Sequence, residues 1–209
     1  MKNKYWYQSQ SNFMNKDLPL LFVGLGNPGM EYELTRHNIG AYVVYHFANS
    51  IGVSFKEKKD LSGFIGKAVI DGQKVIFLLP TTFMNLSGQA VSKCMNYFDI
   101  PVENLLVLSD DTYIPFLDVR LKMGGSAGGH NGLKDIEIKL NTKEYKRLRI
   151  GIGEKTTEDL ADYVLQLFAK REQEKMDDIV DKCIQIIKTK VIAKEDKALG
   201  KNNISGEMK

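Results

Sequence analysis

The sequence predicts a single α/β domain with a mixed β-sheet flanked by helices, and three observations carry this prediction. Strand-like segments alternate with segments of helical periodicity along most of the chain, as is typical of α/β folds. The dipeptide Asp71-Gly72 lies between two strand-like segments and favours a tight hairpin, so the sheet is expected to be mixed rather than purely parallel. A length of 209 residues suits one domain with small appendages.

The strand-like segments are short and either apolar throughout or alternating. They occupy residues 20–24, 52–56, 63–70, 74–79, 104–108, 119–122 and 147–151. The helix-like segments repeat apolar residues at helical spacing or follow a helix-start signal. They occupy residues 36–50, 85–98, 133–140, 157–169 and 171–191. A glycine-rich loop at residues 124–132 separates the sixth strand from the third helix.

Composition sets broad limits on the class of protein. Residues 1–17 lack the apolar stretch of a secretory signal and are expected to be a disordered extension or sequence upstream of an alternative start at Met14, while residues 193–209 are expected to form a polar tail. No apolar run approaches about 18 residues, so we expect no membrane span and a cytoplasmic location. The net charge of +3 suits a nucleic-acid partner only if basic residues gather on one face. Cys94 and Cys183 lie in apolar stretches and are expected to be buried free thiols.

One glycine motif resembles a dinucleotide-binding turn. Gly24, Gly26 and Gly29 match the pattern GxGxxG after a strand. Such a site needs a helix that opens at the last glycine and an acidic residue about 20 positions later. Here Pro28 interrupts the turn, so a plain strand-to-loop connection is favoured. Asn27 remains unusual, because a simple turn does not need a side-chain amide there.

A second glycine motif resembles the nucleophile elbow of α/β-hydrolases. Gly124, Ser126 and Gly128 match GxSxG, but that elbow needs an acid and then a histidine later in the chain. The only later histidine is His130, with no acid between it and the serine. The loop therefore favours close backbone approach by a ligand over a serine nucleophile.

Polar residues at the ends of predicted elements are the remaining candidates. They are His37 and Asn38 at the first helix, Asn85 at the second, Asp110 and Asp111 after a strand, and His130 and Asn131 after the glycine loop. Each alone fits a cap or turn residue. Together they indicate a site, because α/β folds bind ligands at the carboxyl ends of strands. A neutral histidine can take a proton from water, and a carboxylate on its other nitrogen would fix its tautomer.

The histidines do not show the spacing of a metal site. His37, His46 and His130 form no HxxxH pair, and no cysteine lies nearby. We therefore predict that the protein uses no metal.

In these motifs the chain resembles the bacterial-type peptidyl-tRNA hydrolases. The matching segments are residues 23–29, Tyr32, 35–40, 80–88, Asp110, 124–135 and 147–153. They occur in the family's order and cover residues 20–187. The chain departs from the family pattern at Tyr113 and Leu117, which stand where an acid and a glycine are usual.

The resemblance implies hydrolysis of the ester bond between the peptide and the tRNA 3′ ribose. It implies a monomeric domain, residues 18–192, with a twisted mixed sheet and no cofactor. It implies that His37 is the base, that Asp110 orients it and that Asn27 lies beside the scissile bond. The binding site for the tRNA 3′ end and the peptide would be lined by Tyr32, Phe83, Met84, Asn85 and Asn131.

Basic residues near the glycine loop suggest a face for the phosphates of the tRNA acceptor stem. They are Lys122, Lys134, Lys143, Lys146 and Arg149. An ordinary solvated surface is the alternative interpretation. A non-catalytic RNA-binding relative of the same fold is the rival function, although a pure binder has no chemical reason to keep the His37 and Asp110 set.

Overall fold

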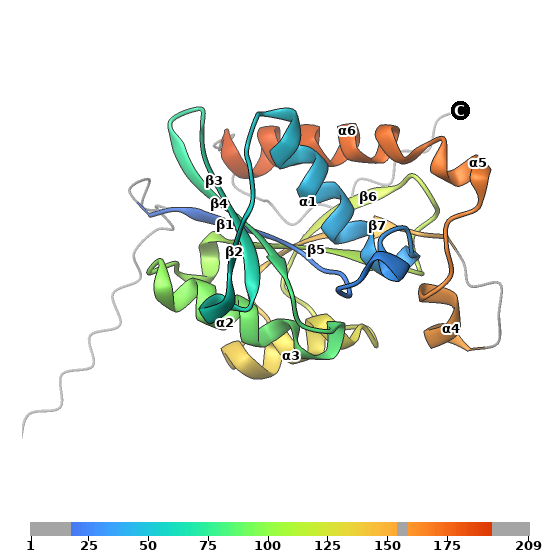
Figure 1. Ribbon diagram of the computed structural model, residues 1–209, viewed down its shortest axis with the longest axis horizontal. Helices are drawn as coiled ribbons and strands as arrows, with labels where there is room; N and C mark the ends of the chain where they lie inside the picture. Colours follow the sequence, from blue (N-terminus) through green and yellow to red (C-terminus); the bar gives the residue numbers. More distant parts are fainter. Residues whose placement is uncertain (1–17, 154–158, 194–209) are drawn as a thin grey trace, which may run out of the picture.

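The protein is a three-layer α/β structure. The computed structural model describes residues 18–153 and 159–193, in which a seven-stranded sheet lies between two layers of helices (Figure 1). One apolar cluster packs α1 (Ile39–Ser50) and α6 (Met176–Ile186) against one face of the sheet. A second cluster packs α2 (Ser87–Tyr97) and α3 (Asn131–Leu140) against the other. The predicted α/β class and the flanking helices are confirmed.

The sheet is mixed, as the sequence predicts. Its strands are β1 (Leu20–Gly24), β2 (Lys56–Lys58), β3 (Gly63–Ile70), β4 (Gln73–Pro80), β5 (Leu105–Asp111), β6 (Val119–Met123) and β7 (Lys146–Gly151), in the order β2-β3-β4-β1-β5-β7-β6. The four central strands β4, β1, β5 and β7 run parallel, and antiparallel strands flank them on both sides. The carboxyl ends of the central strands therefore meet at one edge of the sheet.

The predicted hairpin turn joins β3 to β4. Ile70 pairs with Gln73, so the loop has two residues. Asp71 and Gly72 both have positive φ, at 49° and 79°. This is the backbone of a type I′ turn, which matches the twist of the flanking strands and explains why Asp-Gly stands there.

Several predicted boundaries are wrong near the helix starts. The first predicted helix begins with a 3-10 turn, Arg36–Asn38, before α1 proper. Asn85 lies in another 3-10 turn, Met84–Leu86, and α2 starts at Ser87. The predicted strand at residues 52–56 is displaced, because the edge strand β2 is Lys56–Lys58 and is exposed. Short 3-10 turns at helix entrances are common and leave little periodic signal.

The predicted helix at residues 157–169 is wrong in extent. Residues 157 and 158 lie outside the described part of the chain, and α4 spans only Leu160–Val164. It ends because Leu167 forms an antiparallel bridge with Thr35. The second predicted late helix is divided into α5 (Lys170–Gln173) and α6, which continues as a π-helical segment, Ile187–Ile192. Long-range pairing has overridden the local periodicity.

Cys94 and Cys183 are buried free thiols, as predicted. Within the described residues, no helix combines the length and the apolar character needed to cross a bilayer. The predicted extension at residues 1–17 and the tail from residue 194 onward lie outside the described residues.

Candidate active site

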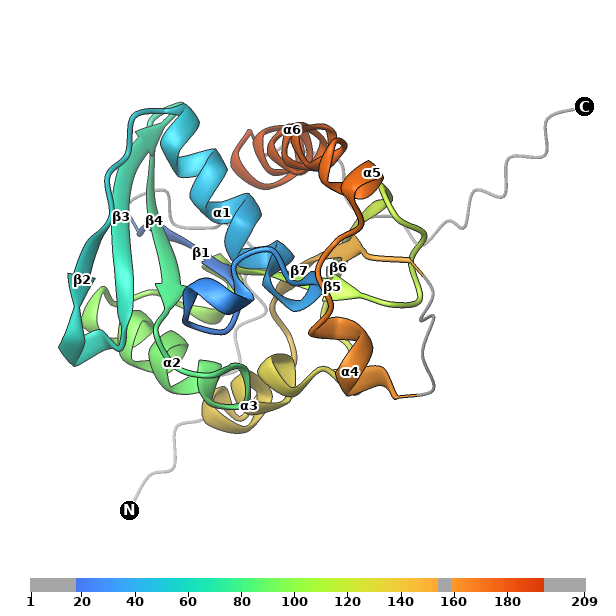
Figure 2. The ribbon, with the colours of Figure 1, turned by 45° about the vertical axis from the view of Figure 1, so that its right-hand side comes forward.

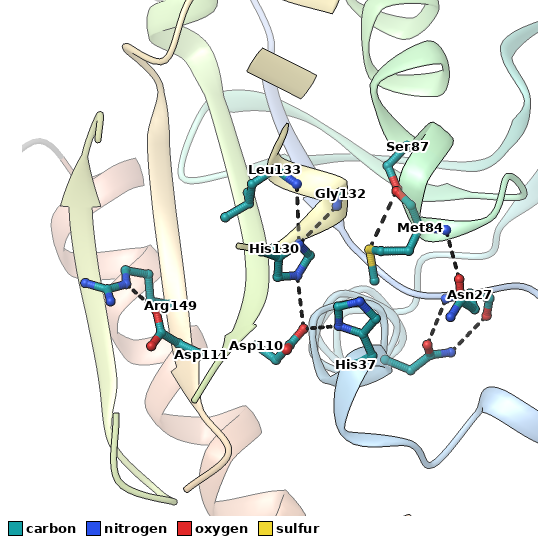
Figure 3. Close-up of polar contacts among 11 residues, drawn as sticks. Asn27, His37, Met84, Ser87, Asp110, Asp111, His130, Gly132, Leu133 and Arg149 are labelled. Atoms are coloured by element: carbon teal, nitrogen blue, oxygen red, sulfur yellow. Dashed lines mark hydrogen bonds and ion pairs between the residues drawn. The ribbon is translucent and has the colours of Figure 1, made fainter. Parts of the chain in front are cut away.

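Two histidines share one buried carboxylate at the carboxyl end of β5. Asp110 Oδ1 lies 2.8 Å from His37 Nδ1 and 3.1 Å from His130 Nε2 (Figure 3). His37 comes from the 3-10 turn that leads into α1, and His130 precedes α3. The rings of the two histidines are 4.7 Å apart between centroids. Three segments far apart in sequence thus meet at a single oxygen atom.

The hydrogen bonds of His130 fix where its proton lies. Its Nδ1 accepts from the backbone N–H groups of Gly132 and Leu133, at 3.1 and 3.3 Å, and thereby caps α3. A nitrogen that accepts carries no proton, so the neutral ring holds its proton on Nε2 and donates it to Asp110. A neutral imidazole also suits the positive end of a helix dipole better than an imidazolium.

The carboxylate stays ionised. Burial alone would raise the pKa of Asp110, but the His37 and His130 rings beside it outweigh this effect and hold that pKa well below its usual range. An ionised Asp110 can only accept, so His37 donates from Nδ1. The Nε2 of a neutral His37 then carries the lone pair, which is the state required of a base.

Asn27 is held firmly in a set of amide contacts. Its Oδ1 accepts from the Met84 backbone N–H at 2.8 Å. The Asn38 side chain binds the main chain of Asn27 from both sides: Oδ1 accepts from Asn27 N at 2.8 Å and Nδ2 donates to Asn27 O at 2.9 Å. Because Asn27 Oδ1 already accepts the hydrogen bond from Met84, the Nδ2 group of Asn27 is the part of that side chain that can donate to a ligand. This amide therefore offers a fixed N–H₂ group (Figure 3).

A cleft of about 410 Å³ opens next to the histidines. Its lining includes five of the residues for which the sequence predicts a role in catalysis or tRNA binding: His37, Asp110, Lys122, Asn131 and Arg149. The glycine loop with His130, the segment that follows β5, Arg147 and helix α4 also contribute to the lining. The other predicted site residues, Asn27, Tyr32, Phe83, Met84 and Asn85, do not line this cleft. Asn27 and Met84 contact each other beside His37, whereas Phe83 is 55% exposed (Figure 3).

Strands β6 and β7 carry a row of four cations, three of which, Lys122, Arg147 and Arg149, line the cleft. Lys122 pairs with Arg147 and Arg120 pairs with Arg149 in the antiparallel register, so all four side chains project from one face. We call these four residues the basic face. Three of them have acidic partners: Arg147 pairs with Glu137 at 2.8 Å, Arg149 with Asp111 at 2.6 Å and Arg120 with Asp118 at 4.0 Å.

The glycine loop takes a path that strand ends alone do not predict. Because β6 is antiparallel to β7, the loop begins at the amino end of β7 and returns to Asp110 at the other edge. Arg147 NH1 donates to Ser126 O at 2.9 Å along the way. His130 and Asn131 follow the glycine loop, as the sequence predicts, and both reach the site. The contact of His130 with Asp110 depends on this path, and the sequence does not predict it.

His130, the histidine that the elbow motif would require, cannot act as a base for the Ser126 hydroxyl. Both of its nitrogens bind Asp110 or the α3 backbone, and Nδ1 of His37 binds Asp110 as well. The serine is exposed in the loop. This geometry supports its interpretation as a chance match to the elbow motif.

The three central residues also form a possible metal-ligand set. The nearest ligand atoms of His37, Asp110 and His130 all lie within 4.8 Å of one another. The contacts to Asp110 have hydrogen-bond lengths, and an ion there would have to displace the two ring protons. Sequence spacing could not reveal this set, and the absence of metal chemistry stays a prediction.

The loop after Asp111 keeps its turn despite the unusual sequence. Asp118 N–H donates to Pro115 O at 3.0 Å, and Leu117, at the third position of this turn, has φ of 74°. That conformation favours glycine, the residue usual in the family, and costs a leucine on the order of 1–3 kcal/mol. The substitution is therefore accommodated by strain rather than by a new loop path.

The fold and the site define an α/β enzyme with a carboxylate-paired histidine in a cleft beside a basic face. A family model described as Peptidyl-tRNA hydrolase matches residues 21–209. The chain belongs to the peptidyl-tRNA hydrolase family, and it is an enzyme that hydrolyses peptidyl-tRNA.

Curated relatives and solved structures agree with this family. The peptidyl-tRNA hydrolase of Clostridium acetobutylicum is 41% identical, covering 88% of this chain and 97% of the relative. That of Geobacillus kaustophilus is 44% identical, covering 82% and 95%. The crystal structure of peptidyl-tRNA hydrolase from Acinetobacter baumannii is 38% identical, with a TM-score of 0.77 over 83% of this chain and 88% of that one.

Proposed function

We propose that His37 is the general base of the hydrolysis and that Asp110 orients it. The observation that carries this proposal is the 2.8 Å hydrogen bond from His37 Nδ1 to a buried, ionised carboxylate. That bond fixes the tautomer, aims the free Nε2, and stabilises the imidazolium that forms when a proton is taken up. The His130 bond to the same oxygen holds the carboxylate in place.

The proposed reaction needs only water and the groups of this chain. His37 Nε2 accepts a proton from a water molecule while the oxygen of that water attacks the ester carbonyl. The oxyanion receives a hydrogen bond from Asn27 Nδ2, or from Asn85. The tetrahedral intermediate then breaks its bond to the ribose oxygen, and the imidazolium returns the proton to that oxygen. General base catalysis contributes about 10²–10⁴-fold and one oxyanion donor about 10²–10³-fold.

Asn27 is the better supported oxyanion donor. Its side-chain orientation is set by Met84 and its backbone by Asn38, so its amide is preorganised. Asn85 is exposed in a 3-10 turn. We assign Asn85, Tyr32, Phe83, Met84 and Asn131 to the surface that receives the tRNA 3′ end and the peptide.

We propose that the basic face receives phosphates of the acceptor stem, with Lys122 and Arg149 as contacts. Both residues line the cleft that contains His37. The ion pair with Asp111 holds the Arg149 guanidinium in a fixed position. We also propose that the working unit is a monomer whose catalytic domain spans residues 18–192.

Release of a blocked amino acid from acyl-tRNA, measured with and without a strong chelator, tests this function. We expect hydrolysis that is unchanged by the chelator, because the mechanism uses no ion. Activity that is lost with chelator and restored by zinc would contradict the metal-free mechanism. Binding of tRNA with no hydrolysis would instead favour the rival RNA-binding function.

A further inference from the structure

Arg36, the residue before His37, carries a charge that is almost completely buried. Its side chain is 9% exposed and meets Glu172 through two bonds, from NH1 to Oε1 at 3.1 Å and from NH2 to Oε2 at 2.8 Å. NH1 also donates to the Ile152 carbonyl at 3.3 Å. The guanidinium thus joins the turn that carries His37 to two segments more than a hundred residues later.

Aromatic rings complete the surroundings of this guanidinium. Its carbon lies 4.8 Å from the centroid of the Tyr163 ring and 4.9 Å from that of Phe168. The Tyr163 hydroxyl donates to the same Ile152 carbonyl at 2.8 Å. Glu172 in turn accepts from the Ala169 N–H at 2.7 Å. Arg36 is therefore fixed from several directions by the chain that follows β7.

The backbone makes the same connection. Arg36 N–H donates to Gln166 O at 3.0 Å, and Phe168 N–H donates to Leu34 O at 3.3 Å, around the bridge between Thr35 and Leu167. Figure 2 shows this later segment passing beside the turn before α1. The paired segment is directly continuous with α4.

Helix α4 is one wall of the cleft. Its residues Leu160, Ala161 and Val164 line the cleft. His37 and the glycine loop line the same cleft. A substrate seated against this wall therefore reaches His37 only if the wall and the base keep their relative position. Arg36 joins the two, because its guanidinium packs on the Tyr163 ring of α4 and is held there by Glu172 of α5.

We propose that Arg36 is a positioning residue, which with Glu172 fixes the α4 wall of the cleft relative to His37 and so sets substrate affinity. Replacement of a buried ion pair by apolar residues is often neutral or stabilising, so stability alone gives little reason for this pair. The planar, two-pronged contact between the Arg36 guanidinium and the Glu172 carboxylate restricts the relative position of the two side chains in a way that apolar packing does not. The proposal rests on the proposed role of His37.

Four variants separate positioning from stability. Arg36→Met leaves the partly buried carboxylate of Glu172 without its partner, which should lower the Tm. The double variant Arg36→Met/Glu172→Leu removes both charges and should recover most of that loss. Arg36→Lys keeps the positive charge but lacks the planar guanidinium that binds both carboxylate oxygens of Glu172. Val75→Ala, in the buried amino-terminal part of β4 away from the site edge, is the matched control for lost stability.

The readout is KM and kcat for peptidyl-tRNA, at a temperature where every variant is folded. We expect about a 10-fold rise in KM for Arg36→Met, for Arg36→Lys and for the double variant, with kcat within about threefold, because the His37 bond to Asp110 is kept. Val75→Ala should leave KM unchanged despite its lower Tm. Recovery of KM together with Tm in the double variant would overturn the proposal, as would an unchanged KM in Arg36→Met.

The His37→Ala protein, assayed beside this series, keeps the two proposals apart. If it retains turnover, the assignment of the base fails whatever the Arg36 variants do. If it loses turnover while the Arg36 variants show normal KM, only the positioning role fails.

Discussion

The cluster of His37, Asp110 and His130 borders the same cleft as three residues of the basic face, and the two regions differ in how their charges are held. The side chains of His37 and Asp110 are 10% and 4% exposed, and their hydrogen bonds fix each proton. The side chain of Arg149 is 28% exposed and belongs to a row of four cations along β6 and β7. We therefore expect the first region to act through the exact placement of a few atoms, and the exposed cations of the second to act through their charge near the surface.

This difference predicts two kinds of response to mutation. Buried, preorganised groups act in a low dielectric, where removal of one group has a large effect that salt changes little. Partly exposed cations act through counterion release, so each contributes modestly and less at high salt. Catalysis and tRNA affinity should therefore be separable by single substitutions.

The largest effect expected inside the cluster, apart from loss of the base itself, comes from Asp110→Asn. An amide oxygen can still accept from both histidines, but it carries no charge to stabilise an imidazolium at His37. We expect turnover to fall by about 10²–10⁴-fold with KM nearly unchanged, as measured in single-turnover hydrolysis of peptidyl-tRNA. A near-normal rate would show that the carboxylate only packs against His37.

The same variant gives an independent check through pH. The folded-state pKa of Asp110 is depressed, so its charge stabilises the fold fully above the unfolded-state pKa of about 3.9 and that stability is lost as the pH falls toward the folded-state pKa. The stability difference between wild type and Asp110→Asn, measured by denaturant titration, should therefore shrink below about pH 4. A constant difference across this range would mean that the carboxylate charge is not what stabilises the cluster.

A smaller effect is expected on the basic face. The Arg149→Ala protein should show a higher KM for tRNA esters and a largely unchanged kcat, because a phosphate contact is lost but the base is intact. Its affinity should depend less on salt, with the slope reduced by about one unit. Equal binding curves for the two proteins across a salt series would remove Arg149 from the tRNA contact surface.

The smallest effect is expected at Ser126. The Ser126→Ala protein should keep most of its rate and accumulate no acyl-enzyme, because water is the proposed nucleophile and both nitrogens of His130 are engaged in other hydrogen bonds. Rapid quenching followed by mass measurement checks this. A covalent adduct on Ser126 in the wild type would overturn the mechanism.

Local patterns in the sequence predict the framework of this protein well. Apolar strand segments and the Asp71-Gly72 turn give the mixed sheet, because both signals arise within a few residues. The family motifs place His37 and Asp110 as a pair, and the two side chains do meet. Their catalytic roles remain proposals.

The features that sequence reasoning missed all depend on long-range contacts. The short α4 results from the bridge between Thr35 and Leu167, which no local periodicity can reveal. The contact of His130 with Asp110 depends on the path of the glycine loop across the sheet. The Arg36–Glu172 pair spans 136 positions in the sequence. Each of these is decided by tertiary packing.

The most direct test of the central claim is the hydrolysis rate of a His37→Ala protein whose folding and tRNA affinity have been measured in parallel. The account predicts normal folding, tRNA binding close to that of the wild type, and a loss of turnover of at least about 10²-fold. Near-normal turnover by a folded His37→Ala protein that binds tRNA would contradict the assignment of His37 as the base.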